Sequence, residues 1–195
     1  MIRTRFFALT CSLALLLTAC GGGAASSSDS PSPSASADRG EELPGLLSSF
    51  TATDLEGNAL DQSMLEGYDL TMVNVWATFC GPCIKEMPDL GKLAEEYREK
   101  GVQIVGLVSD TLNSDGTLSD SQVELARDIV DQTGADYPHI LPSPDLFGIL
   151  SQISAVPTTF FVDCEGNQVG VAFSRSLDRE SWIQVIDEHL AEVGK

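Results

Sequence analysis

The stretch VNVWATFCGPC, residues 73–83, decides the fold because an apolar run leads directly into two cysteines separated by two residues. The run from Leu70 to Thr78 is rich in β-branched residues, which is typical of a buried central strand. From about Cys80 to Lys100 apolar side chains recur at helical spacing, and Gly101 can end that helix with a left-handed cap. The stretch therefore predicts a strand, a tight turn and a helix that begins at the cysteines.

Further strands and helices are expected on both sides of this unit. A capping-box pattern, Ser121-x-x-Glu124, predicts the start of a helix that Gly134 ends. A β-α-β beginning and a β-β-α end predict an α/β fold with a central mixed β-sheet flanked by helices. The remaining expected elements are strands at 49–53, 102–109, 158–163 and 168–173, a turn at 54–58, a hairpin turn at 164–167 and a helix at 178–193.

Residues 1–19 have the pattern of a signal peptide. Arg3 and Arg5 precede an apolar run of twelve residues, 6–17, whereas a membrane-spanning helix needs about 20. The sequence Leu-Thr-Ala-Cys that ends at Cys20 resembles the bacterial lipobox. This resemblance implies cleavage before Cys20 and a lipid anchor on its thiol, although an ordinary secretory signal is the alternative.

Residues 20–45 are expected to be an extended tether in front of the folded domain. They are rich in Gly, Ser, Ala and Pro and have no apolar periodicity, so they cannot bury enough surface to fold. The domain itself is expected to occupy residues 46–195, which makes the preceding part an N-terminal extension.

The charge of the chain excludes one large class of partners. Eleven Lys and Arg stand against 29 Asp and Glu, for a net charge of −18. Such a surface repels phosphate backbones, so we expect no nucleic-acid binding. The chain is 43% hydrophobic, enough for a folded core, and we expect a monomer.

Metal and haem sites are disfavoured by the cysteine and histidine pattern. A zinc site needs about four ligands, and the only histidines, His139 and His189, are expected in a loop and on a helix surface. Haem attachment requires a histidine at position 84, which is Ile84. We therefore expect no metal and no cofactor, and we expect Cys164 to be a free thiol in a turn.

The two paired cysteines suit thiol chemistry. Cys80 at a helix N-terminus would meet unpaired N–H groups and the helix dipole, which favour a thiolate. Cys83, one turn later, can reach back to close a disulfide.

The segment WATFCGPC, residues 76–83, resembles the active site of thioredoxin. Pro88 matches the proline that kinks the thioredoxin active-site helix, and Val156-Pro157 matches the loop whose proline is cis and faces the cysteines. Within that superfamily the chain is most similar to the extracytoplasmic TlpA/ResA-like thiol-disulfide reductases. The lead-in FTATDLEGNAL, residues 50–60, and the insertion LNSDGTLSDSQ, residues 112–122, follow that pattern, and the resemblance covers about residues 46–193.

The resemblance implies a redox-active Cys80–Cys83 disulfide and an assisting carboxyl group. Glu86 matches the buried glutamate of the ResA-like proteins, and Asn74 stands where thioredoxin has an aspartate. A buried Glu86 would have a raised pKa and could exchange protons with the thiols, and the alternative is a solvated helix glutamate. The expected docking surface consists of Trp76, which equally fits a plain core position, and of Gly81, Pro82, Val156 and Pro157.

The implied function is a protein-disulfide reductase on the outer face of the bacterial cytoplasmic membrane. Cys80 attacks a substrate disulfide and Cys83 resolves the mixed disulfide. Substrates in the resembled family include apocytochrome c, during cytochrome c maturation, and methionine sulfoxide reductases, and the electrons come from a membrane thiol carrier of the CcdA/DsbD type. Gly81-Pro82 is the dipeptide of reducing thioredoxin, which favours reduction over the alternative, a disulfide-forming oxidase.

Three other functions fit the sequence less well. A thiol peroxidase needs Pro and Thr at positions 73 and 77, which are Val73 and Ala77. A copper-delivery protein of this fold uses C-x-x-x-C, and the spacing here is one residue short. A passive lipoprotein scaffold would not need the cysteines.

Overall fold

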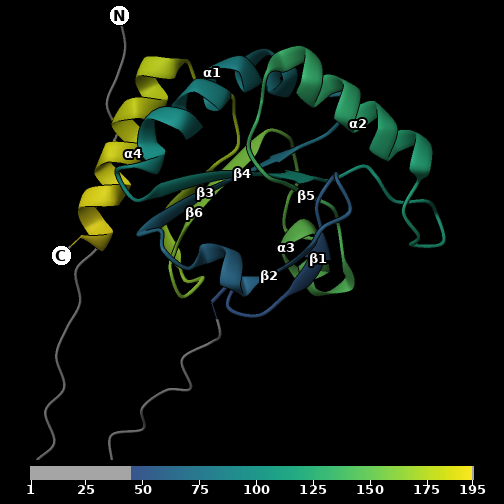
Figure 1. Cartoon of the computed structure of the whole chain (residues 1–195), viewed down its shortest axis with the longest axis horizontal. Helices are drawn as coiled ribbons and strands as arrows, with labels where there is room; N and C mark the ends of the chain where they lie inside the picture. The colour runs from purple at the N-terminus through teal and green to yellow at the C-terminus, as the bar shows by residue number, and fades with distance from the viewer. Residues whose placement is uncertain (1–44, 195) are drawn as a thin grey trace, which may run out of the picture. The chain divides into compact units, whose positions relative to one another are not determined.

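The computed structural model describes residues 45–194 (Figure 1). The expected signal peptide, the lipid site at Cys20 and nearly all of the expected tether lie outside the described residues. The elements, in chain order, are β1 (Thr51–Thr53), β2 (Ala59–Asp61), η1 (Gln62–Leu65), β3 (Leu70–Trp76), α1 (Gly81–Arg98), β4 (Val102–Val108), α2 (Asp120–Thr133), β5 (His139–Ile140), η2 (Pro144–Leu146), α3 (Phe147–Leu150), β6 (Thr158–Asp163), β7 (Gln168–Phe173) and α4 (Arg179–Val193).

The main sheet is mixed, as the order of predicted strands and helices requires. It has five strands in the order β5-β4-β3-β6-β7. β3, β4 and β5 run parallel, while β6 is antiparallel to both β3 and β7. A separate antiparallel pair, β1 and β2, is joined by a turn in which Gly57 has a φ of 86°. The predicted thioredoxin-like α/β fold is confirmed.

Two layers of elements cover the two faces of the main sheet. α1, α2 and α4 lie over one face, and α3 with β1 and β2 lies against the other (Figure 1). β3 is buried along its whole length, and its side chains alternate between the layers. Met72 and Trp76 pack beneath α1, whereas Val73 and Val75 pack on the opposite side. The strand that leads into the cysteines is thus fixed from both faces.

The helix ends agree with the sequence in part. Gly101 and Gly134 adopt positive φ values of 82° and 64°, as their expected roles after the two helices require. The capping box at Ser121 is wrong, because α2 begins two residues earlier with Ser119 as its N-cap, and the Ser119 side chain makes no capping hydrogen bond. Thr111 O accepts a hydrogen bond from Ser119 N at 2.8 Å, so the preceding loop sets where α2 starts.

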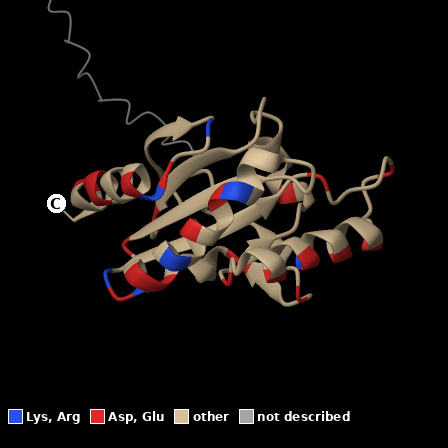
Figure 2. Cartoon of the chain, turned by 90° about the horizontal axis from the view of Figure 1, so that it is seen from above, with Lys and Arg blue, Asp and Glu red and all other residues tan. Residues whose placement is uncertain are grey.

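Among the charged residues that the structure describes, acidic ones are more frequent than basic ones (Figure 2). Figure 2 shows Asp and Glu along the helices and in the loops, with fewer Lys and Arg between them. Within residues 45–194, we find no helix that combines the length and the apolar character needed to cross a membrane.

Candidate active site

A disulfide between Cys80 and Cys83 stands at the start of α1. The S–S distance is 2.00 Å and the two Cα atoms are 5.3 Å apart. Cys80 is the N-cap of the helix, and the backbone N–H of Cys83 donates to Cys80 Sγ at 3.3 Å. The expected pairing of these cysteines agrees with the structure, and Cys164 is the exposed free thiol among the described residues.

The position of Cys80 favours its thiolate form once the disulfide is reduced. The first N–H groups of α1 have no helical partner, and one of them already points at Cys80 Sγ. A negative charge on that sulfur would be stabilised by this N–H and by the helix dipole. Of the two sulfurs, Cys80 Sγ is thus the one that the start of α1 favours as a thiolate.

Exposure separates the two cysteines. Cys80 is 5% exposed, whereas Cys83 is completely buried. The neighbouring Phe79 is 78% exposed, and Gly81 and Pro82 are also at the surface. A partner protein can reach Cys80, and Cys83 is accessible only from within the domain.

The turn in front of Cys80 is held by the end of β4. The Asp110 carboxylate accepts the N–H of Thr78 at 3.0 and 3.1 Å, and it accepts the Thr78 hydroxyl at 2.6 Å. Ser109 donates to the Trp76 carbonyl through both its N–H and its hydroxyl. No role for Asp110 could be predicted from the sequence, because an Asp after a strand looks like ordinary loop composition.

Glu86 lies in the interior, one helical turn after Cys83. It is 4% exposed, and burial raises its pKa to about 7. Hydrogen bonds from Asn74 Nδ2 at 3.0 Å and from the backbone N–H of Leu177 at 3.2 Å act in the opposite direction, but burial dominates. Trp182 lowers this pKa slightly further, although its indole N–H makes no hydrogen bond within residues 45–194. The carboxyl group is thus suited to gain and lose a proton near neutral pH.

Asn74 connects the carboxyl group to the sheet. Its Nδ2 also donates to Thr159 Oγ1 at 2.9 Å, so one amide joins β3, α1 and β6. Asn74 Oδ1 is buried and has no hydrogen-bond partner in the described part of the chain. The amide therefore fixes the Glu86 carboxylate in place without adding a second titratable group.

Trp76 and His139 form a buried pair, which corrects two sequence expectations. His139 lies in β5 and not in a loop, and it is buried because β5 pairs with the central strand β4. Trp76 Nε1 donates to His139 Nδ1 at 3.1 Å, and His139 Nε2 donates to the Ala135 carbonyl at 3.0 Å. Trp76 is fully buried, so it is a core residue and cannot touch a docked partner. Burial lowers the pKa of His139 to about 4, which keeps the imidazole neutral.

His189 is also buried, contrary to the expectation of a surface histidine. Its ring stacks on Phe161 with centroids 4.3 Å apart, and its Nδ1 lies 2.7 Å from the Val185 carbonyl. The burial of His189 could not be predicted from the sequence, because the neighbouring residues of α4 are polar and a histidine does not count toward an apolar periodicity. Residues 45–194 hold no group of three or more His, Cys, Asp and Glu that could bind a metal ion.

Two openings flank the disulfide. One is a groove of about 480 Å³ whose described lining residues are all uncharged, and the other is a cleft of about 230 Å³ that reaches Glu86. The Val156–Pro157 peptide bond beside the groove is cis, as expected. Pro157 is buried, so of these two residues expected in the docking surface only the half-buried Val156 reaches the groove. The groove is lined by Phe79, Ser109, Leu150, Ile153, Ser154, Ala155 and Val156, and the cleft by Pro82, Lys85, Glu86, Asp89, Ser176, Leu177 and Asp178.

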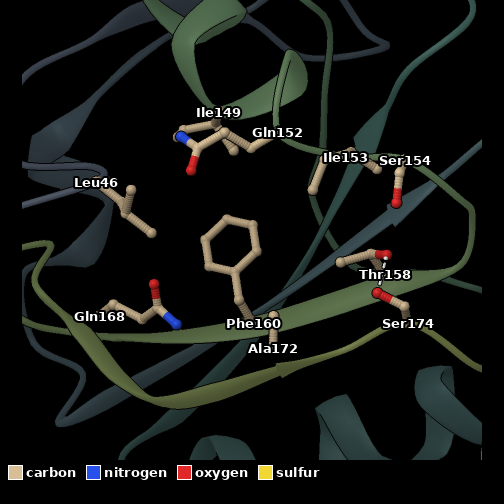
Figure 3. Close-up of a pocket in the computed structure, with 10 residues that line it drawn as sticks. All are labelled: Leu46, Ile149, Gln152, Ile153, Ser154, Thr158, Phe160, Gln168, Ala172 and Ser174. Carbon is tan, nitrogen blue, oxygen red and sulfur yellow. Dashed lines mark hydrogen bonds between the residues drawn. The ribbon is translucent and has the colours of Figure 1, made fainter.

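A third pocket, of about 200 Å³, lies between α3 and the β6–β7 pair (Figure 3). Phe160 stands in its middle, and the Thr158 and Ser174 hydroxyls are hydrogen bonded at 3.1 Å along one side. It meets the groove at Ile153 and Ser154. Its described lining residues include no acid, amine or thiol.

The Redoxin family model matches residues 38–170. The chain belongs to this family. Among its relatives, the thiol-disulfide oxidoreductase ResA of Bacillus thuringiensis (strain Al Hakam) is 31% identical over 131 residues, which are 67% of this chain and 66% of that protein. ResA of Oceanobacillus iheyensis is 35% identical over 131 residues, 65% of this chain and 60% of that protein. The match thus spans a little under two thirds of the length of these redoxins.

Solved structures agree with the fold. A thiol:disulfide interchange protein of the thioredoxin family from Chlorobium tepidum TLS has a TM-score of 0.61 at 23% identity, covering 77% of this chain and 99% of that one. A secreted disulfide oxidoreductase of Mycobacterium tuberculosis, homologous to DsbE of E. coli, has a TM-score of 0.54 at 18% identity, covering 75% and 96%. At these identities the likeness establishes the thioredoxin-like fold alone.

Proposed function

We propose that this redoxin is a thiol-disulfide oxidoreductase, tethered to a membrane outside the cytoplasm, that reduces disulfides in exported proteins. The observation that carries the proposal is the Cys80–Cys83 disulfide at the start of α1, in which Cys80 can be reached and Cys83 is sealed. The relatives named thiol-disulfide oxidoreductase ResA support the same activity.

The cycle begins with the reduced protein. The Cys80 thiolate attacks a substrate disulfide, forms a mixed disulfide and releases one substrate sulfur as a thiolate. Glu86 takes the proton from Cys83, and the Cys83 thiolate then attacks Cys80 Sγ. The second substrate sulfur leaves, so that two electrons have passed from the dithiol to the substrate and the Cys80–Cys83 bond is restored.

The reducing direction rests on Gly81-Pro82 between the cysteines, which is the dipeptide of reducing thioredoxin. Glu86, with a pKa of about 7, can accept the Cys83 proton near neutral pH and return it in the reverse step, so it supports the exchange at Cys83 in both directions.

The cellular setting is carried by the N-terminal sequence. Residues 1–19 and Cys20 support export and a lipid anchor on the outer face of the cytoplasmic membrane, and residues 20–45 support a tether. A reductase outside the cytoplasm has no glutathione pool to renew it. We therefore assign its electron supply to a membrane thiol carrier of the CcdA/DsbD type.

The groove beside Cys80 supports a protein substrate. Its described lining residues are uncharged although the whole chain carries −18, and Phe79 and Val156 offer apolar surface within it. A substrate cysteine with an apolar neighbour in an extended segment fits this surface. Apocytochrome c and methionine sulfoxide reductase are the substrates that the family resemblance suggests.

The experiment traps the mixed disulfide, in a full chain that carries Cys164→Ser so that its exposed thiol does not react. Cys83→Ser removes the resolving thiol, so the chain with this further change is expected to accumulate a mixed disulfide between Cys80 and an oxidised substrate peptide. The wild-type chain releases the reduced peptide, and Cys80→Ser does neither. Mass spectrometry of acid-quenched samples distinguishes these outcomes, and a Cys83→Ser chain that never captures the peptide would refute the proposed activity.

A further inference from the structure

A docked substrate creates a problem of proton movement at this site. The mixed disulfide places a partner protein over Cys80 and the groove beside it. Resolution then requires Cys83, which is completely buried, to lose its proton. Glu86 can accept that proton, but Glu86 is itself only 4% exposed and must pass the proton on before the next cycle.

The cleft beside Glu86 supplies a second opening at the site. Its volume is about 230 Å³, and its walls are the first two turns of α1, from Pro82 to Asp89, and the segment Ser176–Asp178 in front of α4. It shares none of its described lining residues with the groove around Phe79 and Val156. Filling the groove with a substrate segment therefore does not require the cleft to close.

Glu86 is held so that its carboxylate lies between the protein interior and this cleft. Asn74 Nδ2, from the sheet side, donates to Oε1 at 3.0 Å. The backbone N–H of Leu177, which lines the cleft, donates to Oε2 at 3.2 Å. One carboxylate oxygen is thus bound on the side of the core and the other on the side of the opening.

We propose that this cleft is the route by which Glu86 releases the Cys83 proton to water while a substrate covers Cys80. The inference rests on the proposed function and adds a division of labour, in which the groove admits the substrate and the cleft admits water. Ser176 and Leu177, far along the chain from the cysteines, thereby become part of the reaction.

The step balances without any further reagent. Cys83 passes its proton to the Glu86 carboxylate, the Cys83 thiolate forms a bond with Cys80 Sγ, and the bond from Cys80 Sγ to the substrate sulfur breaks with its electron pair on the substrate. The neutral carboxylic acid then gives its proton to water in the cleft, and the substrate thiolate takes a proton from the solvent.

The charged groups around Glu86 suit a proton leaving by this route. Lys85 and Asp89 on α1 and Asp178 at the start of α4 line the cleft, so two carboxylates and one ammonium group surround the opening. On the core side the phenol of Tyr137 is the titratable neighbour, and burial together with the charge of Glu86 raises its pKa far above neutral. A proton therefore has acceptors toward the cleft and none toward Tyr137.

The test is to close the cleft with a bulky side chain. Ser176 is exposed and lines the opening, so Ser176→Phe fills it. Ser114→Phe is the matched control, because Ser114 is an exposed serine in the loop before α2 and lines neither opening. The full chain carrying Cys164→Ser, reduced and in detergent, is mixed with a peptide whose cysteine is joined to 2-thiopyridine, so that the exposed thiol of Cys164 does not react.

The two chemical steps are followed separately. Release of thiopyridone reports attack by Cys80, and the decay of the mixed disulfide in acid-quenched samples reports resolution by Cys83. Ser176→Phe is expected to leave the first rate within about twofold and to slow the second by about tenfold or more, a part of the usual contribution of acid–base catalysis. Ser114→Phe is expected to leave both rates unchanged.

A second cleft variant, Asp89→Phe, and a variant of the carboxyl group, Glu86→Gln, distinguish failure of the proposed route from failure of the proposed function. Asp89→Phe closes the cleft from α1 and is expected to slow the same step, which keeps the test valid if Ser176→Phe does not fold. If Glu86→Gln slows resolution while both cleft variants resolve at the wild-type rate, the route is wrong and the oxidoreductase stands. If the wild-type chain never resolves its mixed disulfide, the proposed function itself fails.

Discussion

Replacing Glu86 with glutamine is expected to change how the stability of the oxidised protein depends on pH. Glu86 is buried, and its pKa rises from the model-compound value of 4.5 to about 7 in the folded chain. In the unfolded chain the carboxyl group returns to its ordinary pKa. Between these two values the folded state therefore holds a proton that the unfolded state has already lost.

The sign follows from this difference in bound protons. Where the folded state binds more protons than the unfolded state, the free energy of unfolding falls as the pH rises. For Glu86 the stabilisation is fully present below about pH 4.5 and is lost by about pH 7. A shift from 4.5 to about 7 corresponds to about 3 kcal/mol, at 1.36 kcal/mol for each pKa unit.

Glu86→Gln removes the titration and keeps the shape. The amide has one oxygen, so it can accept from Asn74 Nδ2 or from Leu177 N but not from both, and the lost hydrogen bond costs about 1–3 kcal/mol. The variant is therefore expected to be less stable than the wild type at pH 4. The difference in the free energy of unfolding between the wild type and the variant is expected to shrink by about 3 kcal/mol as the pH is raised to 8. Only the wild type is destabilised by a buried charge at that pH.

Urea unfolding of the oxidised chain at several pH values between 4 and 8 measures this difference, with the fluorescence of the buried Trp76 and Trp182 as the signal. Glu95→Gln, an exposed carboxyl group on the same helix, is the control and should run parallel to the wild type. A gap between wild type and Glu86→Gln that stays constant across this range would refute the reasoning on Glu86.

Two further changes test how the site is supported. Gly106→Ala in β4 places a methyl group against His139 Nδ1 and Trp76 Nε1, so it should lower the free energy of unfolding by about 1–3 kcal/mol in urea melts, and unchanged stability would contradict the buried pair. Asp110→Ala removes the acceptor of both Thr78 donors and should cost about 1.5–3 kcal/mol at pH 7, whereas Asp115→Ala, in the exposed loop, should cost less than about 0.5 kcal/mol; equal losses would refute the role of Asp110.

The central part of the fold could be predicted from the sequence because its signals are local. β3 and β4 read as continuous apolar runs, and β6 and β7 occupy the predicted ranges 158–163 and 168–173. β5 was missed because it is only two residues long and exists through its pairing with β4, which no local pattern records. β2 and α3 were also missed, because they are short and a turn-rich sequence surrounds them.

The candidate site could likewise be predicted only in part from the sequence. The cysteine pair follows from spacing, and the position of Glu86 follows from family resemblance. The partners that give these residues their properties come from distant parts of the chain and could not be read locally. Leu177 N reaches Glu86 from 91 residues away, and His139 meets Trp76 across 63 residues. The same contacts explain why Trp76 is core and why a histidine between prolines is buried.

The reduction potential of the Cys80–Cys83 pair tests the central claim most directly. The full chain carrying Cys164→Ser, so that no other described cysteine reacts, would be equilibrated against dithiol buffers of defined potential and its thiols counted by mass spectrometry. A reductase predicts a midpoint of about −250 mV or below, close to thioredoxin. A midpoint of about −120 mV would contradict that claim, because a pair so easily reduced takes electrons from its partners and forms their disulfides.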